Sequence, residues 1–165
     1  MRRGIWHFAV PEEFGKEQLM KIRVMLTEDY DAVYSLWIRT PGMGLNRVDD
    51  SREGIEKYLK RNPTTCFIAE EEGRLIGVIL SGHDGRRGYI HHTAVDRTKR
   101  KGGIGTALLN AAMDALKAEG IIKVALVVFK KNETGNHFWD EKGFEKRQDL
   151  IYRNKSLQDI QRIDT

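Results

Sequence analysis

The chain has 165 residues, a length that favours one domain because domains commonly hold about 100–200 residues. Hydrophobic residues make up 40% and charged residues 32%, with only 3 prolines, which is typical of a globular chain and excludes a disordered or fibrous one. The one cysteine, Cys66, excludes an internal disulfide and a zinc site built on several thiolates. It fits a reducing compartment, so we expect a cytoplasmic protein that binds no metal.

The net charge of +4 is a mild excess that would help to attract a small polyanion. It is too weak to indicate DNA, and the basic residues gather at one helix start instead of forming a stripe with exposed aromatics. No apolar run approaches the roughly 18–20 residues of a membrane span. We therefore expect neither nucleic acid nor a membrane as a partner.

The first elements follow from hydrophobic periodicity. Residues 1–21 show no sustained period and are interpreted as an N-terminal extension ahead of a domain at 22–165. Alternation over 22–26 predicts a strand, and Thr27 is the expected N-cap of a helix that ends before Pro41.

The middle of the chain predicts a second helix and a hairpin. Asp50 is the expected cap of that helix, because Glu53 follows three residues later as in a capping box. Residues 66–70 and 75–80 read as two strands around a tight turn.

The last third predicts a crossover between parallel strands. The nearly continuous apolar run at 123–129 is typical of a strand covered on both faces. Together the pattern indicates an α+β fold with one parallel step. In chain order the expected elements are a strand at 89–95, a helix from about Gly103 to Gly120, a strand at 123–129, a helix at 133–142 and a strand around 150–152.

A basic, glycine-rich segment joins the strand that ends at Val95 to the long helix. Its backbone N–H groups and the positive end of the helix dipole would converge on one spot, which indicates a phosphate site. A mononucleotide P-loop would need a lysine after its last glycine, and a dinucleotide motif would need glycine at Leu108. The candidate phosphate-binding residues are Arg100, Lys101, Gly102, Gly103, Ile104, Gly105 and Thr106.

Arg100, Gly103 and Gly105 match the pattern Gln/Arg-x-x-Gly-x-Gly/Ala, and the segment resembles motif A of the GNAT superfamily of acetyl-CoA-dependent N-acetyltransferases. Downstream residues resemble motif B of the same family, and the resemblance covers roughly residues 22–153. One departure is Arg97, where the family usually has proline. The motif B positions are Asn132, Gly135, Phe138, Trp139, Gly143 and Phe144.

The resemblance implies acetyl-CoA as cosubstrate and a single GNAT-like domain. Its sheet would be mixed and mostly antiparallel, with a splayed parallel central pair and helices on both faces. The pyrophosphate would lie on the N–H groups of residues 100–106, and the pantetheine arm along the strand that ends at Val95. Asn132 and Phe138 would contact that arm.

The resemblance also implies direct attack by a primary amine on the acetyl thioester in a ternary complex. An alkyl amine has a pKa near 10.4, so a base or a water chain must remove its proton. Strand alternation predicts that His91 and His92 face opposite sides, so that only one faces the cleft. His91 matches the position of a base in histidine-bearing relatives such as the aralkylamine acetyltransferases, and His92 is expected to be structural.

Trp139 stands where the family usually has the tyrosine that protonates the departing thiolate. Tyr152 and His137 are the candidate replacements. Cys66 reads as a buried hydrophobe and not as an acyl carrier. The loss of that acid keeps a second function open, a non-catalytic acyl-CoA-binding or regulatory module. The acceptor stays open between a small-molecule amine and a protein or peptide amine, and the resemblance allows a homodimer.

Overall fold

A computed structural model describes residues 6–8 and 20–163. The helices are α1 (Tyr30–Ile38), α2 (Arg52–Arg61), α3 (Ile104–Ala118) and α4 (Glu133–Glu141), with 3-10 turns at Thr27–Asp29 and Arg97–Lys99. The strands are β1 (Trp6–Phe8), β2 (Met20–Val24), β3 (Leu45–Asn46), β4 (Phe67–Glu71), β5 (Arg74–His83), β6 (Gly88–Val95), β7 (Val124–Leu126) and β8 (Arg162–Ile163).

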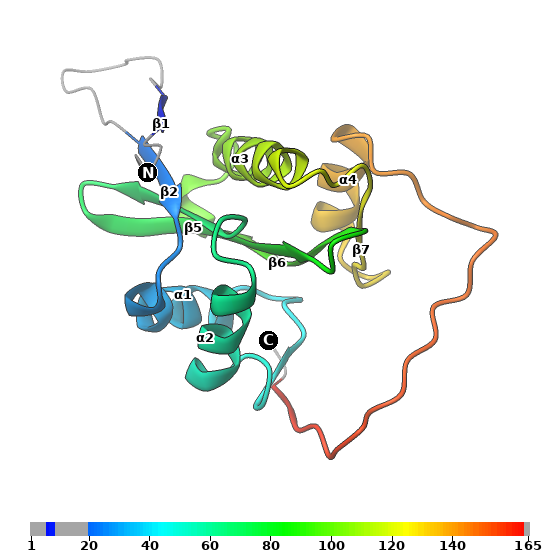
Figure 1. Cartoon of the computed structure of the whole chain (residues 1–165). Coiled ribbons are helices and arrows are strands. Elements are labelled where there is room, and N and C mark those ends of the chain that lie inside the picture. The colour runs from blue at the N-terminus through cyan, green and yellow to red at the C-terminus, as the bar shows by residue number, and fades with distance from the viewer. Residues whose placement is uncertain (1–5, 9–19, 164–165) are drawn as a thin grey trace.

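Six strands form one mixed sheet in the order β1-β2-β4-β5-β6-β7, and only β6 and β7 run parallel. Helices α1 and α2 cover one face, and α3 and α4 lie on the other (Figure 1). Each face of the sheet has its own hydrophobic core. Trp37 of α1 is fully buried in the core under α1 and α2, and Leu108 of α3 is fully buried in the core under α3 and α4. The expected α+β fold with helices on both faces is confirmed.

Part of the predicted extension lies in the sheet. Trp6–Phe8 pairs antiparallel with β2, which begins at Met20, two residues before the predicted strand. The rest of residues 1–19 is outside the described residues.

The caps of the first two helices differ from the prediction. Thr27 begins a 3-10 turn and does not cap α1. The Asp29 carboxylate accepts the backbone N–H of Leu26 at 2.8 Å. Ser51, not Asp50, caps α2, because its hydroxyl accepts the N–H of Gly54 at 3.0 Å. Asp50 is buried and turns toward the sheet instead.

The predicted strand at 123–129 is shorter than expected. Only Val124–Leu126 pairs with β6, and the side chains that follow are open, with Val127 56% and Phe129 39% exposed. The prediction of a strand covered on both faces is therefore wrong. The parallel strands separate beyond Ile90 and Leu126, where their pairing ends, and this is the expected splay.

The predicted strand at 150–152 is absent from the described residues. Residues 145–161, here called the C-terminal arch, form neither helix nor strand and swing away from the body (Figure 1). The chain returns as β8, which pairs with β3 in a two-stranded sheet. β7 is thus the last strand in the sheet, so the parallel pair lies at its edge and not at its centre.

Among the described helices, none combines the length and apolar character that crossing a bilayer requires.

Candidate active site

The turn before α3 takes the shape expected of a phosphate cradle. Gly103 at the N-cap has a φ of +78° and Lys101 a φ of +66°, so the chain is left-handed at two positions just before the helix. The N–H groups of Ile104 to Thr106 have no intrahelical carbonyl to donate to, because they begin the helix. They lie at the positive end of a 15-residue helix, where an anion is stabilised.

Gly105 brings α3 against α4. A Cβ on Gly105 would lie 3.3 Å from the Phe138 ring and 3.8 Å from the Val95 side chain. A larger residue would therefore push these elements apart. The glycines of the segment thus serve two purposes, backbone conformation at Gly103 and close packing at Gly105.

Hydrogen bonds and an ion pair fix the 3-10 turn Arg97–Lys99, which leads into the cradle. The Asp96 carboxylate is buried and accepts both the N–H and the hydroxyl of Thr98, at 2.9 and 2.7 Å, and these bonds lower the pKa of Asp96. Lys99 pairs with Glu71. Among the described residues no carboxylate forms an ion pair with Arg100 or Lys101, and the Nε of Arg100 donates to the Val95 carbonyl oxygen at 3.3 Å. The positive charge of both side chains is therefore not neutralised by a described carboxylate.

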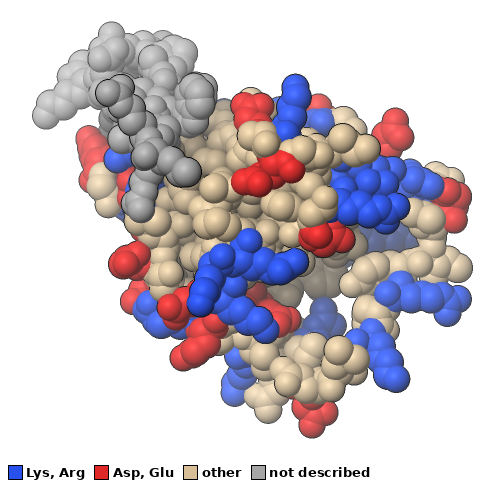
Figure 2. Space-filling view, viewed as in Figure 1, with Lys and Arg blue, Asp and Glu red and all other residues tan. Residues whose placement is uncertain are grey.

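The cradle opens into a cavity of about 2090 Å³ that continues past β6 to the loop before α2. Figure 2 shows the surface hollowed beside the C-terminal arch. The cavity exceeds the range of about 300–1,000 Å³ that is usual for small-molecule sites, so it has room for two substrates. Gly102 is not part of its lining. The predicted site residues that do line it are His91, Val95, Arg100, Lys101, Gly103, Ile104, Gly105, Thr106, Asn132, Phe138 and Tyr152.

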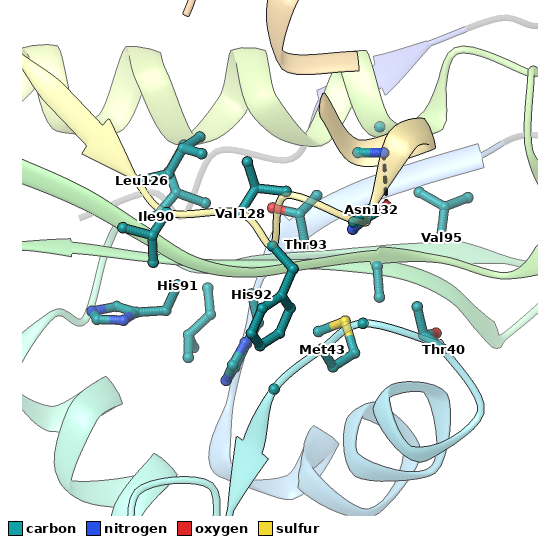
Figure 3. A pocket seen from close by; sticks show the side chains of 18 of the residues that line it. Thr40, Met43, Ile90, His91, His92, Thr93, Val95, Leu126, Val128 and Asn132 are labelled. Atoms are coloured by element: carbon teal, nitrogen blue, oxygen red, sulfur yellow. Dashed lines mark hydrogen bonds between the residues drawn. The ribbon is translucent and has the colours of Figure 1, made fainter. Parts of the chain in front are cut away.

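The splay between β6 and β7 opens onto the same cavity. Beyond Ile90 the β6 backbone has no β7 partner, so its polar groups on that side are available to an extended ligand. Thr93 lies on the side of Val128 and Asn132 (Figure 3), and its hydroxyl is buried without a hydrogen-bond partner. A buried unpaired hydroxyl is costly and fits a site built for a polar ligand.

A β-bulge overturns the expected alternation of the two histidines. Leu80 is opposite His92 but Ser81 is opposite Ile90, so His91 is an extra residue in β6. His91 and His92 both lie on the α1 and α2 side of the strand (Figure 3). Both line the cavity, and the prediction that only one of them faces the cleft is wrong.

His91 is held between two tyrosine rings. Its ring centroid lies 5.4 Å from Tyr58 of α2 and 4.7 Å from Tyr89. Burial of the ring, and next the charge of His92, lower the pKa of His91, while Asp50 and Asp49 oppose that shift. The imidazole is therefore neutral at pH 7 and able to accept a proton.

His92 is locked to the loop before α2. Its Nε2 lies 2.7 Å from Asp50 Oδ1, and its ring packs edge-on against Trp37 at 4.9 Å. The other Asp50 oxygen accepts the backbone N–H of Asn46 at 2.7 Å. The other ring nitrogen of His92, Nδ1, is buried without a hydrogen-bond partner. Sequence reasoning missed this role of Asp50 because the residue resembles a helix cap.

The motif B residues have mainly structural contacts. Asn132 caps α4 by accepting the N–H of Gly135 at 2.9 Å, and it also lines the cavity. Trp139 packs between Phe138 and Phe144, with ring centroids 4.9 and 5.1 Å away. An indole N–H is no usable acid, so Trp139 is a wall of the cavity.

The remaining candidates differ sharply in exposure. Tyr152 lies on the arch and is 68% exposed. The pKa of Tyr89 is raised by burial and, second, by the charge of Tyr152.

Cys66 is fully buried, and its Sγ contacts the Ser81 carbonyl oxygen at 3.0 Å. Burial raises the pKa of this thiol to about 12. A thiol of that kind is neither ionised nor reachable, which excludes it as an acyl carrier.

The described residues contain no cluster of three His, Cys, Asp or Glu side chains suited to a metal ion.

Comparisons with known proteins identify the family. The model of the acetyltransferase (GNAT) family matches residues 30–144. An acetyltransferase of Photorhabdus laumondii is 32% identical over 139 residues, which cover 84% of this chain and 96% of that protein. An acetyltransferase of Sodalis glossinidius is 30% identical over 138 residues, with the same coverage of both chains.

Solved structures share the fold at lower identity. The aminoglycoside acetyltransferase AAC(6')-Iy, bound to a bisubstrate analogue, has a TM-score of 0.64 at 19% identity, covering 83% of this chain and 98% of that one. PaiA N-acetyltransferase from Thermoplasma acidophilum, bound to coenzyme A, has a TM-score of 0.63 at 17% identity, covering 74% and 87%. A Clostridium acetobutylicum structure with acetyl-CoA reaches 0.64 at 22% identity, covering 82% and 96%.

Proposed function

Because this chain belongs to the GNAT family of acetyltransferases, and is an acyltransferase that uses acetyl-CoA, we propose that it acetylates a primary amine by direct attack in a ternary complex. One observation carries this proposal. The cradle before α3 and the splay beyond Ile90 both open into the same cavity. Acetyl-CoA supplies an activated acetyl thioester. The chain's own residues must hold it, free the amine and let the thiolate leave.

The residues before and within the first turn of α3 fit the pyrophosphate of acetyl-CoA. A Cβ on Gly103 would meet nothing within 4 Å, so an anion can approach this backbone closely. Arg100 and Lys101 add positive charge at the same point. The pantetheine arm would run along the open side of β6 past Thr93 and Val95, with Phe138 and Asn132 on its other side.

His91 is the proposed general base. It accepts a proton from the acceptor ammonium, and the freed amine nitrogen forms the new C–N bond as the C–S bond breaks. Unpaired N–H groups of β6 in the splay would stabilise the developing negative charge on the carbonyl oxygen. His91 suits this role because it is neutral at pH 7, lines the cavity and is partly exposed, whereas Nδ1 of His92 is buried.

Asp50 and His92 position the acceptor side of the site. Their 2.7 Å contact ties the loop before α2 to β6, and the Tyr30 hydroxyl reinforces the tie by donating to the Asp50 carbonyl oxygen at 2.8 Å. This loop carries Met43, which also lines the cavity. The acceptor would lie between the loop and the two histidines.

Tyr152 is proposed as the group that protonates the departing thiolate. General acid catalysis typically contributes about 10²–10⁴-fold, and a thiol with a pKa near 8.5 also leaves as an anion. The proposed role is thus an accelerating one. Turnover does not depend on it completely.

The proposed acceptor is a small-molecule amine, and the proposed location is the cytoplasm. Asp49 and Glu53 line the acceptor side together with Asp50, and carboxylates attract an ammonium group. Single-cysteine composition with a buried thiol is consistent with a reducing compartment.

Calorimetric titration with acetyl-CoA, followed by a thiol-release assay on amines and N-terminal peptides, tests the proposal. We expect binding, and turnover with at least one small amine. Binding with no turnover on a wide panel would contradict catalysis and favour an acyl-CoA-binding module. No binding would overturn the assignment of the cradle.

A further inference from the structure

A second, smaller cavity adjoins the large one beside His91. Its volume is about 480 Å³, within the range of about 300–1,000 Å³ that is usual for small-molecule sites. The His91 ring points away from Met43 and Val95 (Figure 3) and lines the smaller cavity as well as the large one. The two spaces therefore adjoin each other at the proposed base. The residues that line both are Tyr58, Arg61, Tyr89 and His91.

The wall of the smaller cavity between α2 and β5 is closely packed. Asn62 is 4% exposed, and its side chain donates to the Tyr58 carbonyl oxygen at 3.3 Å and accepts the His83 backbone N–H at 3.0 Å. Gly82 permits this approach, because a Cβ there would lie 2.5 Å from both the Asn62 side chain and the Tyr58 hydroxyl. The end of α2 is thus fixed against β5, and this places Arg61, the last residue of α2, at the cavity.

The lining of the smaller cavity has a net positive charge. It contains three cations, none of which forms an ion pair with a carboxylate among the described residues. Asp84, the one acidic residue in the lining, accepts the backbone N–H groups of Arg86 and Arg87 at 2.8 and 2.7 Å. Asp149 pairs with Arg147 instead of with a cation of the cavity. The three cations are Arg61 of α2, Arg87 before β6 and Lys123 before β7.

Arg87 and Lys123 are neighbours on adjacent chain segments. The residues that follow them are register partners in the parallel pair, and the Gly88 N–H donates to the Lys123 carbonyl oxygen at 3.0 Å. The Arg87 Nη1 donates to the carbonyl oxygen of the preceding residue at 3.2 Å, which leaves its charge unneutralised. Two like charges side by side repel each other, and an anion between them removes that repulsion.

The opposite charge lies on the other side of His91. Asp49, Asp50 and Glu53 line the large cavity at the loop before α2 and at the start of α2, whereas the three cations line the smaller cavity. A molecule with an ammonium group at one end and an anionic group at the other matches this distribution of charge.

We propose that the acceptor is an amine that also carries a carboxylate or a phosphate. Its anionic group binds to Arg61, Arg87 and Lys123 in the smaller cavity, and its amine lies at His91 in the large one. The inference rests on the proposed acetyl transfer and names its class of acceptor. Binding of the anionic group holds the amine beside the thioester, which favours the reaction through proximity.

Matched pairs of acceptors test this class. His91 lies three residues after Gly88, about 10 Å along the strand, so the panel needs chains of several lengths. We would compare β-alanine, γ-aminobutyrate and ε-aminocaproate with their neutral amides, and O-phosphoethanolamine with ethanolamine, in the thiol-release assay. In at least one pair the anionic member should have a kcat/KM about 10-fold higher, the effect of one hydrogen bond to a charged group. Whether a carboxylate or the phosphate pair shows it identifies the anion. Equal or higher kcat/KM for the neutral member of every pair would overturn the proposal and leave acetyl transfer intact.

Substitution of the cations tests the site itself, and the chain offers a neighbouring control for two of them. Arg87→Gln and Arg61→Gln should each weaken binding of the anionic amine about 10-fold. Arg86→Gln and Lys60→Gln remove the same charge from adjacent residues that line neither cavity, so they should leave the Kd unchanged. Lys60 also matches Arg61 in lying in the last turn of α2, where a cation stabilises the helix.

Calorimetric titration of the same anionic amines into protein saturated with coenzyme A measures these Kd values without turnover. Equal Kd values for Arg87→Gln and Arg86→Gln, and for Arg61→Gln and Lys60→Gln, would overturn the proposed site. If none of the amines is acetylated, the proposed function fails for this panel, and the Kd values still decide whether the smaller cavity binds the anion.

Discussion

Gly103 offers a sharp test of the cradle because the same helix provides its control. Gly103 and Gly120 stand at the two ends of α3, both have a φ of +78°, and at both a Cβ would meet nothing within 4 Å. Alanine at either position must adopt a left-handed conformation, which costs about 1–2 kcal/mol. The two variants should therefore lose similar stability, and melting temperatures should fall by about 2–8 °C in each.

Only Gly103→Ala should weaken acetyl-CoA binding. Its Cβ would project into the open space where the pyrophosphate is proposed to lie, and relief of the strain would turn the adjacent N–H groups away. A hydrogen bond to a charged group contributes about 1.5–3 kcal/mol, so losing one should raise the Kd about 10- to 150-fold. Titration calorimetry on both variants measures this difference. Equal affinities for Gly103→Ala and Gly120→Ala would refute the cradle.

Three further predictions concern the histidines and the thiol. Because the pKa of His91 is lowered, kcat/KM of the natural protein should fall with decreasing pH only below about pH 6.5. His91→Ala should lower kcat and abolish this fall, while the affinity for acetyl-CoA stays unchanged. A variant whose pH profile keeps the fall would show that another group is the base. Asp50→Asn should lower the free energy of unfolding by about 1–3 kcal/mol and raise the KM for the acceptor, because it weakens the contact with His92. Asp49 does not contact His92, so Asp49→Asn should change the free energy of unfolding by less than about 0.5 kcal/mol. Denaturant titration measures both changes. Cys66 should react with a thiol reagent only in denaturant, and labelling of the native protein without loss of fold would contradict its burial.

Local sequence signals predicted the elements whose causes are themselves local. The turn between β4 and β5 has positive φ at Glu72 and Gly73, and the glycine takes this conformation without a steric cost. The long helix α3 ends before Gly120, whose φ of +78° stops it. The cradle is local as well, because its glycines, its basic residues and the helix start are consecutive in the chain.

Features that depend on distant partners were not predicted. Asp50 resembles a cap in sequence, but its carboxylate is taken by His92, 42 residues away, and Ser51 caps α2 instead. The apolar run at 123–129 resembles a buried strand, but its pairing stops at Leu126 because the splay removes its neighbour. Periodicity describes one chain segment and carries no information about whether a partner strand is present.

The bulge at His91 shows how one such feature decides the chemistry. Strict alternation would send His91 and His92 to opposite faces, and one histidine would be lost to the α3 side. The extra residue in β6 instead leaves both on the acceptor side, with His92 bound to Asp50 and His91 partly exposed beside Tyr58. The contact with Asp50 holds the His92 imidazole in place, whereas the His91 imidazole has no such partner among its ring contacts. A single inserted residue therefore places both histidines on the side of the cavity where we propose His91 as the base and His92 as a positioning residue.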